Sequence, residues 1–489
     1  MCIGIFTSFS VFLGNLGGED RFFQFTVLPF GLATAGHIFT KVMRCLVQHW
    51  RRASINILVY LDDGLGIDSN YQSAVFNSHR VRSDIVKSGF VFNVKKSTWQ
   101  PTSSLAWLGI EMHLKEGYIC VPETKVRAVL GMIDRMLAHK RTTYRSLAGV
   151  VGRLISMSVV LGDITHLMLR FSHVTILNRS CWDAYFELPV AVLQELTFWK
   201  GAIANLNVRK LFNPVVIHRM VYSDVSDSGC GGYIVNIDNT ECIRSWSPSE
   251  AKRSSSWREL KAVVVILESV GHLLKDRNVR WYTDNQAIVS IVNKGSMRMH
   301  LHVLALAVRK LCISNNLNLF MEWIPRSLND RADYLSRVRD IDDWRVSRQF
   351  FKFIDELWGP HTVDRFANDR NAQLPRFNSL YWSPGSEGVD AFAFRWSGEN
   401  NWLVPPISNI IACVNYLLIN KAPATLIVPR WRSAVYWPLL VDEHGCFPNF
   451  IVDFRLFRNS LGIFENGSVP SIFGDTFRSP VLALRINKS

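Results

Sequence analysis

The sequence predicts a multidomain protein of mixed α/β and α+β class. At 489 residues the chain is longer than a single hydrophobic core usually organises. A hydrophobic content of 48% with 12% aromatic residues is typical of globular proteins rather than of disordered ones. The spacing of apolar residues also changes along the chain, which indicates several folding units in succession.

Changes in periodicity and composition divide the chain into six segments. Strands and helices alternate in residues 1–125, and helical spacing dominates residues 126–213. A β-rich block then opens and becomes an alternation of helices and strands over 214–338. The remaining segments are a charged linker (339–349), a compact α/β unit rich in Trp, Pro and Asn (350–445), and a tail without a clear signal (446–489).

The charge balance suits a polyanionic partner. Lys and Arg outnumber Asp and Glu by 55 to 41, which gives a formal net charge of +14. Contacts with phosphates release condensed counterions, although a basic surface also simply keeps a protein soluble. Nine cysteines are scattered without a Cys-x-x-Cys pair, and no apolar run reaches membrane-spanning length. We therefore expect an intracellular protein, in cytoplasm or nucleus, with no membrane partner.

A short apolar run, Asn56–Tyr60, ends in the box Tyr60-Leu61-Asp62-Asp63, and a second run follows after Gly64. A tight turn between two strands presents adjacent carboxylates, and Mg²⁺ prefers oxygen ligands of this kind. An ordinary hairpin, in which the Asp-Asp pair favours the turn, explains the same residues equally well. The box alone leaves both interpretations open.

Flanking blocks make this segment resemble a reverse transcriptase. Upstream stands Leu28-Pro29-Phe30-Gly31, and downstream come Lys95 and Lys96 and then Trp107-Leu108-Gly109. The resemblance implies a polymerase palm in which Asp62 and Asp63 bind metal and Lys95 or Lys96 approaches the pyrophosphate leaving group. It implies further that the Leu-Pro-Phe-Gly block packs under the incoming nucleotide and template, and that the Trp-Leu-Gly turn is the primer grip.

A polymerase palm needs another Asp from an earlier strand, so that two metals are held by carboxylates on both sides. The acidic residues before Leu28 are Glu19 and Asp20, in a Gly-Gly-Glu-Asp turn too near the Leu-Pro-Phe-Gly block. We therefore expect a partial palm, in a chain that begins inside the polymerase domain, with an incomplete site for RNA-directed DNA synthesis.

Acidic residues recur at the ends of the elements expected in 214–338. Asp224 ends a strand and precedes a glycine-rich turn, and Asp284 ends another strand. Glu259 lies in the first turn of a helix expected over Trp257–Val270. The start of a last helix carries Asp330 and Asp333.

Each of these acids has a structural explanation of its own. Ser256 and Glu259 have the spacing of a capping box, and Asp284 suits a helix N-cap. Asp330 or Asp333 complements a helix dipole. These explanations are the simpler ones for each residue taken singly.

Taken together, the acids match the RNase H pattern in kind and order, and residues 214–338 resemble that family. The resemblance implies that one sheet edge gathers four carboxylates around two Mg²⁺ ions, with Mn²⁺ as a substitute, which activate water and stabilise the leaving 3′ oxygen. The implied ligands are Asp224, Glu259, Asp284 and Asp333, with Asp330 as the less favoured fourth. The loop 325–328 lacks the His that helps product leave in some relatives, so we expect slow turnover.

The helical segment carries apolar residues at helical spacing over Val126–Leu137, Tyr144–Val160 and Ala191–Ala204. It resembles the thumb and connection of tyrosine-recombinase retrotransposons of the DIRS and Ngaro type. In that resemblance Arg145 and Arg153 follow the backbone of the hybrid.

The same kinship extends to residues 359–406, where that lineage carries a domain similar to DNA adenine-N6 methyltransferases. Active enzymes of that class hold a flipped adenine with an Asp or Asn, two prolines and an aromatic ring. Here Val404 and Ile407 flank the two prolines, so the polar acceptor and the ring are missing. We expect a structural remnant, in which Asp364 and Asp390 are candidate borders of a nucleoside pocket.

The leading hypothesis is a retrotransposon reverse transcriptase and RNase H polyprotein whose activity in this chain is hydrolysis of RNA in RNA–DNA hybrids. The expected partners are an RNA template, a DNA primer and the hybrid, with dNTPs where the polymerase site is complete. One alternative is a non-catalytic nucleic-acid-binding remnant of a retroelement, and another is a DNA adenine methyltransferase. The sequence leaves the oligomeric state open.

Overall fold

The computed structural model describes residues 11–16, 19–24, 33–212, 214–340, 344–467, 471–474 and 476–487. The chain divides into two compact units, 1–128 with 203–212 and 129–202 with 213–489. Within the described ranges no helix combines the length and apolar character needed to cross a membrane.

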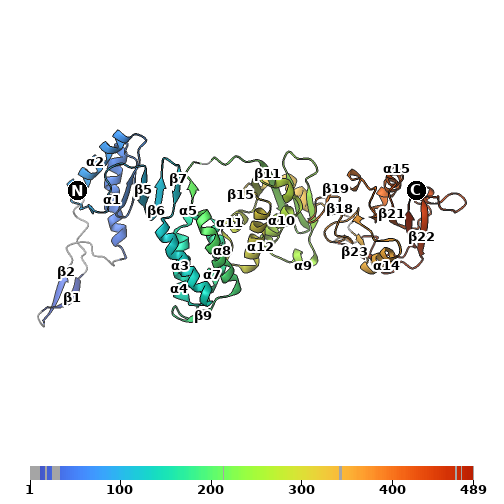
Figure 1. Ribbon diagram of the computed structural model, residues 1–489, viewed down its shortest axis with the longest axis horizontal. Helices are drawn as coiled ribbons and strands as arrows, with labels where there is room; N and C mark the ends of the chain where they lie inside the picture. The colour runs from blue at the N-terminus through green and yellow to red at the C-terminus, as the bar shows by residue number, and fades with distance from the viewer. Residues whose placement is uncertain are drawn as a thin grey trace. The chain divides into compact units, whose positions relative to one another are not determined.

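In its described residues, the first unit contains two hairpins and two helices before its main sheet, and both helices are labelled in Figure 1. Strands β1 (Val11–Leu16) and β2 (Glu19–Gln24) pair antiparallel, so Glu19 and Asp20 belong to a strand rather than to the expected turn. The next elements are α1 (Ala35–Arg52), β3 (Ile57–Tyr60), β4 (Asp63–Gly66) and α2 (Tyr71–Lys87). A small core of Trp50, Ile55, Ile57 and Val81 joins them.

An antiparallel sheet of four strands completes the first unit, in the order β10-β7-β6-β5. Its strands are β5 (Ser104–Trp107), β6 (Ile110–His113), β7 (Tyr118–Cys120) and β10 (Arg209–Lys210). Leu108 and Gly109 form the two-residue turn between β5 and β6, both with positive φ (48° and 77°). That combination is typical of a type I′ hairpin turn, whose twist matches the flanking strands. The hairpins expected around 57–67 and 104–113 are thereby confirmed.

A helical segment opens the second unit, and its core is formed by the fully buried Ile133, Leu147, Leu154, Leu196 and Trp199. Its elements are α3 (Glu123–His139), β8 (Arg141–Thr143), α4 (Tyr144–Ser156), α5 (Ser158–Leu161), α6 (Ile164–Leu167), α7 (Arg170–Leu177), β9 (Tyr185–Glu187) and α8 (Val190–Leu206).

The single helix expected over Tyr144–Val160 is interrupted at Met157. Ser156 Oγ donates a hydrogen bond to the Arg153 carbonyl (2.7 Å), which competes with the helical backbone pattern at this point. In the same segment the buried carboxylate of Glu195 accepts hydrogen bonds from the Phe171 and Ser172 amides. These amides lie in the first turn of α7, where backbone N–H groups have no partner within the helix.

The central sheet of the second unit is mixed, with the strand order β13-β12-β11-β14-β15. Strands β11 (Arg219–Val225), β12 (Gly229–Ile234) and β13 (Cys242–Ser245) pair antiparallel, and β14 (Asn278–Thr283) and β15 (Asn318–Trp323) continue parallel to β11. The helices of this region are α9 (Pro248–Ala251), α10 (Ser255–Val270), α11 (Gln286–Lys294), α12 (Met299–Ser314) and α13 (Asp330–Arg337) (Figure 1).

Two adjacent glycines allow helices to approach both faces of β12. A Cβ on Gly231 would lie 2.5 Å from the Cβ and carbonyl carbon of Leu335 in α13. A Cβ on Gly232, on the opposite face of the strand, would lie 2.5 Å from Ile266 Cδ1 in α10. These glycines therefore lie inside a strand, not in the turn that the sequence suggested, and they allow the close approach of α13 and of α10 to the sheet.

A second mixed sheet, β17-β20-β21-β24-β22, organises the C-terminal region. Its strands are β17 (Val363–Asp364), β20 (Asn401–Leu403), β21 (Ala424–Pro429), β22 (Ile451–Phe457) and β24 (Val481–Ile486). The other elements are β16 (Trp344–Val346), α14 (Arg348–Trp358), β18 (Asn378–Ser379), β19 (Gly388–Val389), α15 (Ile410–Asn420), α16 (Trp437–Leu440) and β23 (Phe464–Asn466).

The expected tail over 446–489 is wrong, because β24 lies inside this sheet between β21 and β22. Five of the six β24 residues are buried, as a central strand with both faces covered requires. The expected linker over 339–349 is also wrong in its described second half. There Trp344 and Val346 are buried in β16, which pairs with β23, and Ser347 caps α14.

The C-terminal region covers the free edge of the central sheet at β13. Arg244 in β13 pairs with Glu250 (3.0 Å) and with Asp369 (3.2 Å), and Arg370 also pairs with Glu250 (3.0 Å). The amide of Trp382 donates to the Glu241 carbonyl beside this edge. Covering an edge strand removes unpaired backbone groups that would otherwise invite pairing with another chain.

We predict that Gly231→Ala destabilises the second unit by about 1–3 kcal/mol, because the added methyl group forces α13 away from β12. Chemical denaturation followed by tryptophan fluorescence measures the effect. Gly201→Ala in α8 is the matched control, since a Cβ there meets nothing within 4 Å and Ala favours a helix. Equal stability of the two variants would show that the close approach of α13 is not needed.

Candidate functional site: an acidic cleft on the central sheet

The register of the parallel strands places two carboxylates side by side. Tyr222 of β11 pairs with Tyr282 of β14, so Asp224 and Asp284, each two residues further on, lie level at the carboxyl ends of the strands. In parallel sheets such ends gather functional residues at one edge. The positions expected for these two acids are therefore confirmed.

Glu259 reaches the same edge from α10. The apolar face expected for this helix is buried, with Leu260, Val263, Val264 and Leu267 each at most 3% exposed. The helix begins earlier than expected, because Ser254 is the N-cap and its side chain accepts from the Trp257 amide. The capping-box explanation of Glu259 is therefore wrong, since Ser256 lies within the helix.

The explanation of Asp284 as a helix N-cap is also wrong, because Asn285 caps α11 and accepts from the Ala287 amide. By contrast, Asp330 and Asp333 both lie in the first turn of α13, as the dipole explanation expects. Glu259 and Asp284 are thus left without a role in capping the local helices.

Asp224, Glu259 and Asp284 form an acidic triad whose carboxylate oxygens lie within 4.8 Å of one another. Burial and the charge of Asp284 raise the pKa of Asp224 to about 7. Burial and the charge of Asp224 raise the pKa of Glu259 to about 8. The Oδ2 atom of Asp224 is buried and finds no hydrogen-bond partner in the described structure. Uncompensated carboxylates of this kind suit a divalent cation, which favours oxygen ligands.

Asp333 lies beside the triad and is held by two arginines. Its Oδ1 accepts from Arg326 and from Arg337, each at 2.8 Å, and the hydrogen bond from Arg337 is the main cause of a pKa lowered to about 2. The carboxylate interacts with Asp224, whose pKa it helps to raise. The geometry therefore brings three of the four expected ligands into one group and places the fourth next to it.

A cleft of about 630 Å³ surrounds the triad. Basic and polar side chains that the sequence had not singled out also line it: Arg258, Arg326, Arg337, Asn285, Gln286 and Trp323. Guanidinium groups bind phosphate oxygens, and an aromatic ring supports stacking contacts with a nucleic acid. Their spacing in sequence gives no signal, although Arg326 lies in the loop already noted for lacking a His.

The Tyr60-Leu61-Asp62-Asp63 box forms the β3–β4 hairpin, with Tyr60 paired to Asp63. Leu61 has φ 51°, a left-handed conformation that is uncommon for a bulky residue. Asp62 and Asp63 are exposed, and no described His, Cys, Asp or Glu joins them in a metal-binding group. The hairpin is confirmed, and metal binding by its two carboxylates stays a prediction.

Of the other residues singled out for the polymerase, Trp107 ends strand β5 and is half-buried, and the rest lie in turns or outside the described residues. Leu28-Pro29-Phe30-Gly31 fall outside the described residues. The amides of Lys95 and Lys96 both donate to Asn93 Oδ1, which shapes an exposed turn. In the helical segment, Arg145 forms a two-pronged ion pair with Asp183, and Arg153 is exposed near the end of α4.

The candidate nucleoside pocket is bordered by only one of its two expected acids. A cavity of about 440 Å³ is lined by Asp390, Phe392, Val404 and Pro406, among others, whereas Asp364 is not part of the lining. Asp364 is buried, which raises its pKa to about 7, and its Oδ2 accepts from the Gln373 amide. Asp364 is therefore a buried residue of the fold rather than a border of this cavity.

The second unit of this multidomain α/β protein therefore carries a mixed five-stranded sheet with a carboxylate cluster at the ends of its parallel strands. Residues 4–112 match the family described as "Reverse transcriptase (RNA-dependent DNA polymerase)".

Several solved structures contain chains to which this chain is similar. RNase H1 from the archaeon Halobacterium salinarum is 17% identical, with a TM-score of 0.21, over 24% of this chain and 92% of that one. LC11-RNase H1 from compost is 21% identical, with a TM-score of 0.22, over 24% of this chain and 93% of that one. The foamy viral protease-reverse transcriptase in complex with RNA/DNA hybrid is 12% identical, with a TM-score of 0.34. The match covers 67% of this chain and 42% of that one, so this chain spans less than half of the viral protein's length. None of the curated proteins compared with the chain matches it.

We predict that Asp224→Asn stabilises the metal-free protein, because it removes one buried charge from the triad. In EDTA at pH 8 the variant should melt roughly 2–4 °C above the wild type, the shift expected for about 1 kcal/mol. Adding Mg²⁺ should stabilise the wild type and leave the variant nearly unchanged.

Asp238→Asn, at an exposed turn position, is the control for removing a negative charge anywhere on the surface. A wild-type melting temperature that does not respond to Mg²⁺ would contradict cation binding by the triad.

Proposed function

We propose that the protein hydrolyses the RNA strand of RNA–DNA hybrids at the acidic cleft. The observation that carries the proposal is the triad of Asp224, Glu259 and Asp284, whose carboxylate oxygens crowd together while Asp224 Oδ2 has no hydrogen-bond partner in the described structure. The match of residues 4–112 to reverse transcriptases supports a nucleic-acid substrate, and so does the net charge of +14.

The triad would hold the Mg²⁺ ions, with Asp333 beside it as the fourth carboxylate. Bound there, Mg²⁺ supplies activation of water and stabilisation of the leaving 3′ oxygen. Arg326 and Arg337 hold the Asp333 carboxylate ionised and fixed on one side of the cleft. This pairing keeps Asp333 ready to act as a ligand without a change of protonation.

The side chains around the triad would position the hybrid. Arg258 is anchored by hydrogen bonds to the Ser226 carbonyl and to Asp227, which leaves its guanidinium on the cleft wall in a fixed orientation. Trp323 is 48% exposed, and its indole N–H donates to the Asp284 carbonyl, so that its ring faces the cleft in one orientation. Fixed donors and rings of this kind orient a phosphate backbone at little entropic cost.

The finer origin of the chain stays a prediction. In that prediction, the protein is a reverse transcriptase and RNase H polyprotein of a DIRS-type retrotransposon. Its helical segment is the thumb and connection, and its C-terminal region is a methyltransferase remnant. RNA-directed DNA synthesis is the further activity that the resemblance of residues 4–112 implies. A nucleic-acid binder without catalysis is the alternative that the following experiment separates from the proposal.

We predict Mg²⁺-dependent cleavage of a labelled RNA–DNA hybrid by the full chain, with little cleavage of single-stranded RNA or double-stranded DNA. Asp224→Asn should lower the rate about 10²–10³-fold, the loss typical of removing one preorganised electrostatic group. No cleavage by the wild type, or equal cleavage by the variant, would reject the proposal in favour of a binding protein.

Two further variants form a matched pair in the first turn of α13. Asp333→Asn should lower the rate as strongly as the loss of a triad ligand, whereas Asp330→Asn should leave it nearly unchanged. A large loss of rate in Asp330→Asn and none in Asp333→Asn would indicate that Asp330 is the fourth ligand.

A further inference from the structure

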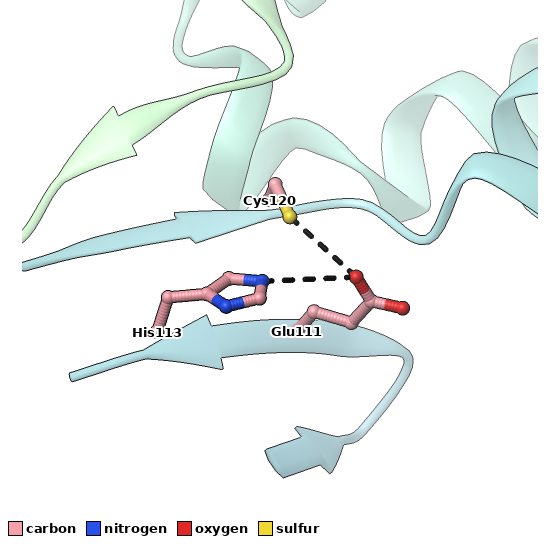
Figure 2. A group of neighbouring side chains, drawn as sticks. All are labelled: Glu111, His113 and Cys120. Carbon is pink, nitrogen blue, oxygen red and sulfur yellow. Dashed lines mark hydrogen bonds and ion pairs between the residues drawn. The ribbon is translucent and has the colours of Figure 1, made fainter. Parts of the chain in front are cut away.

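Three potential metal ligands converge on one face of the four-stranded sheet in the first unit. Glu111 and His113 lie two residues apart on β6, and Cys120 lies opposite Glu111 on β7. Residues paired across antiparallel strands point to the same face, as do residues two apart on one strand. Figure 2 shows one oxygen of the Glu111 carboxylate facing both the His113 ring and the Cys120 sulfur.

The spacing of the three side chains leaves room for a shared ion. Cys120 Sγ donates a hydrogen bond to Glu111 Oε2 at 3.7 Å, His113 Nε2 lies 3.8 Å from the same oxygen, and all three ligand atoms lie within 4.8 Å of one another. A good N–H···O hydrogen bond is about 2.7–3.2 Å long. Tetrahedral Zn²⁺, with bonds of about 2.0–2.3 Å, places neighbouring ligand atoms roughly 3.3–3.7 Å apart.

The imidazole is oriented by neighbours outside the group. Ser104 Oγ lies 3.2 Å from His113 Nδ1, and the Tyr118 ring stacks on the imidazole at 4.6 Å. When Nδ1 donates to Ser104, Nε2 keeps its lone pair and faces Glu111. A hydrogen bond of this kind to the second ring nitrogen is typical of histidines that bind metal.

We propose that Glu111, His113 and Cys120 form a binding site for Zn²⁺ that is separate from the acidic cleft. A thiolate, an imidazole and one carboxylate are the ligand types that Zn²⁺ accepts, whereas Mg²⁺ prefers oxygen alone. All three side chains are half-buried, so an ion can enter from solvent and the fourth position is open to water. The bound ion ties β6 to β7 and stabilises the strands that carry the turn at Leu108 and Gly109.

Co²⁺ added to the metal-free full chain tests this site, because a thiolate ligand gives Co²⁺ an intense near-ultraviolet charge-transfer band. We expect the band in the wild type and in Cys45→Ser, its loss in Cys120→Ser and His113→Asn, and displacement of Co²⁺ by Zn²⁺. Cys45 is the matched control, since it is an exposed cysteine on α1. Circular dichroism checks that each variant is folded.

Ser104→Ala keeps all three ligands and removes only the partner of His113 Nδ1. It should weaken Zn²⁺ binding about 10–100-fold, as loss of an outer hydrogen bond does in other sites. Absence of the band in the wild type, or its retention in folded Cys120→Ser, would overturn the proposal. So would equal Zn²⁺ affinity of the wild type and Ser104→Ala. Cleavage of hybrid RNA plays no part in this test, so its failure and that of the proposed function are distinguishable.

Discussion

The parallel register of β11 and β14 is the constraint on which the candidate site depends. With Tyr222 level with Tyr282, the two strands deliver Asp224 and Asp284 to the same height at one sheet edge. A shift of one residue would turn one carboxylate to the other face of the sheet. The register is held by the buried core beneath it, where the Trp281 indole donates to Ser223 Oγ at 2.8 Å.

The surrounding packing maintains a cluster of charges that is unfavourable by itself. Gly231 and Gly232 let α13 and α10 approach β12 closely, and these helices carry Asp333 and Glu259 to the edge. Burial then raises the pKa values of Asp224 and Glu259, whereas two arginines lower that of Asp333. Clustered carboxylates that repel one another in a cleft are typical of functional sites, where a bound cation or substrate relieves the repulsion.

Local patterns predicted some parts of this structure and long-range contacts decided the others. The hairpin at Asp62 and Asp63 and the buried face of α10 follow from turn chemistry and helical spacing, which are visible in a few residues. The strand β24 was missed because its apolar run pairs with partners about thirty and sixty residues away. The arginines of the cleft were missed for the same reason, since only the fold brings Arg258 and Arg326 to one wall.

The claim that Asp224, Glu259 and Asp284 form a divalent-cation site is tested most directly by anomalous X-ray diffraction from crystals grown with Mn²⁺. We expect an anomalous peak between the three carboxylates in the wild type and its loss in Asp224→Asn. A well-ordered cleft without a peak, or a peak that persists in the variant, would contradict it.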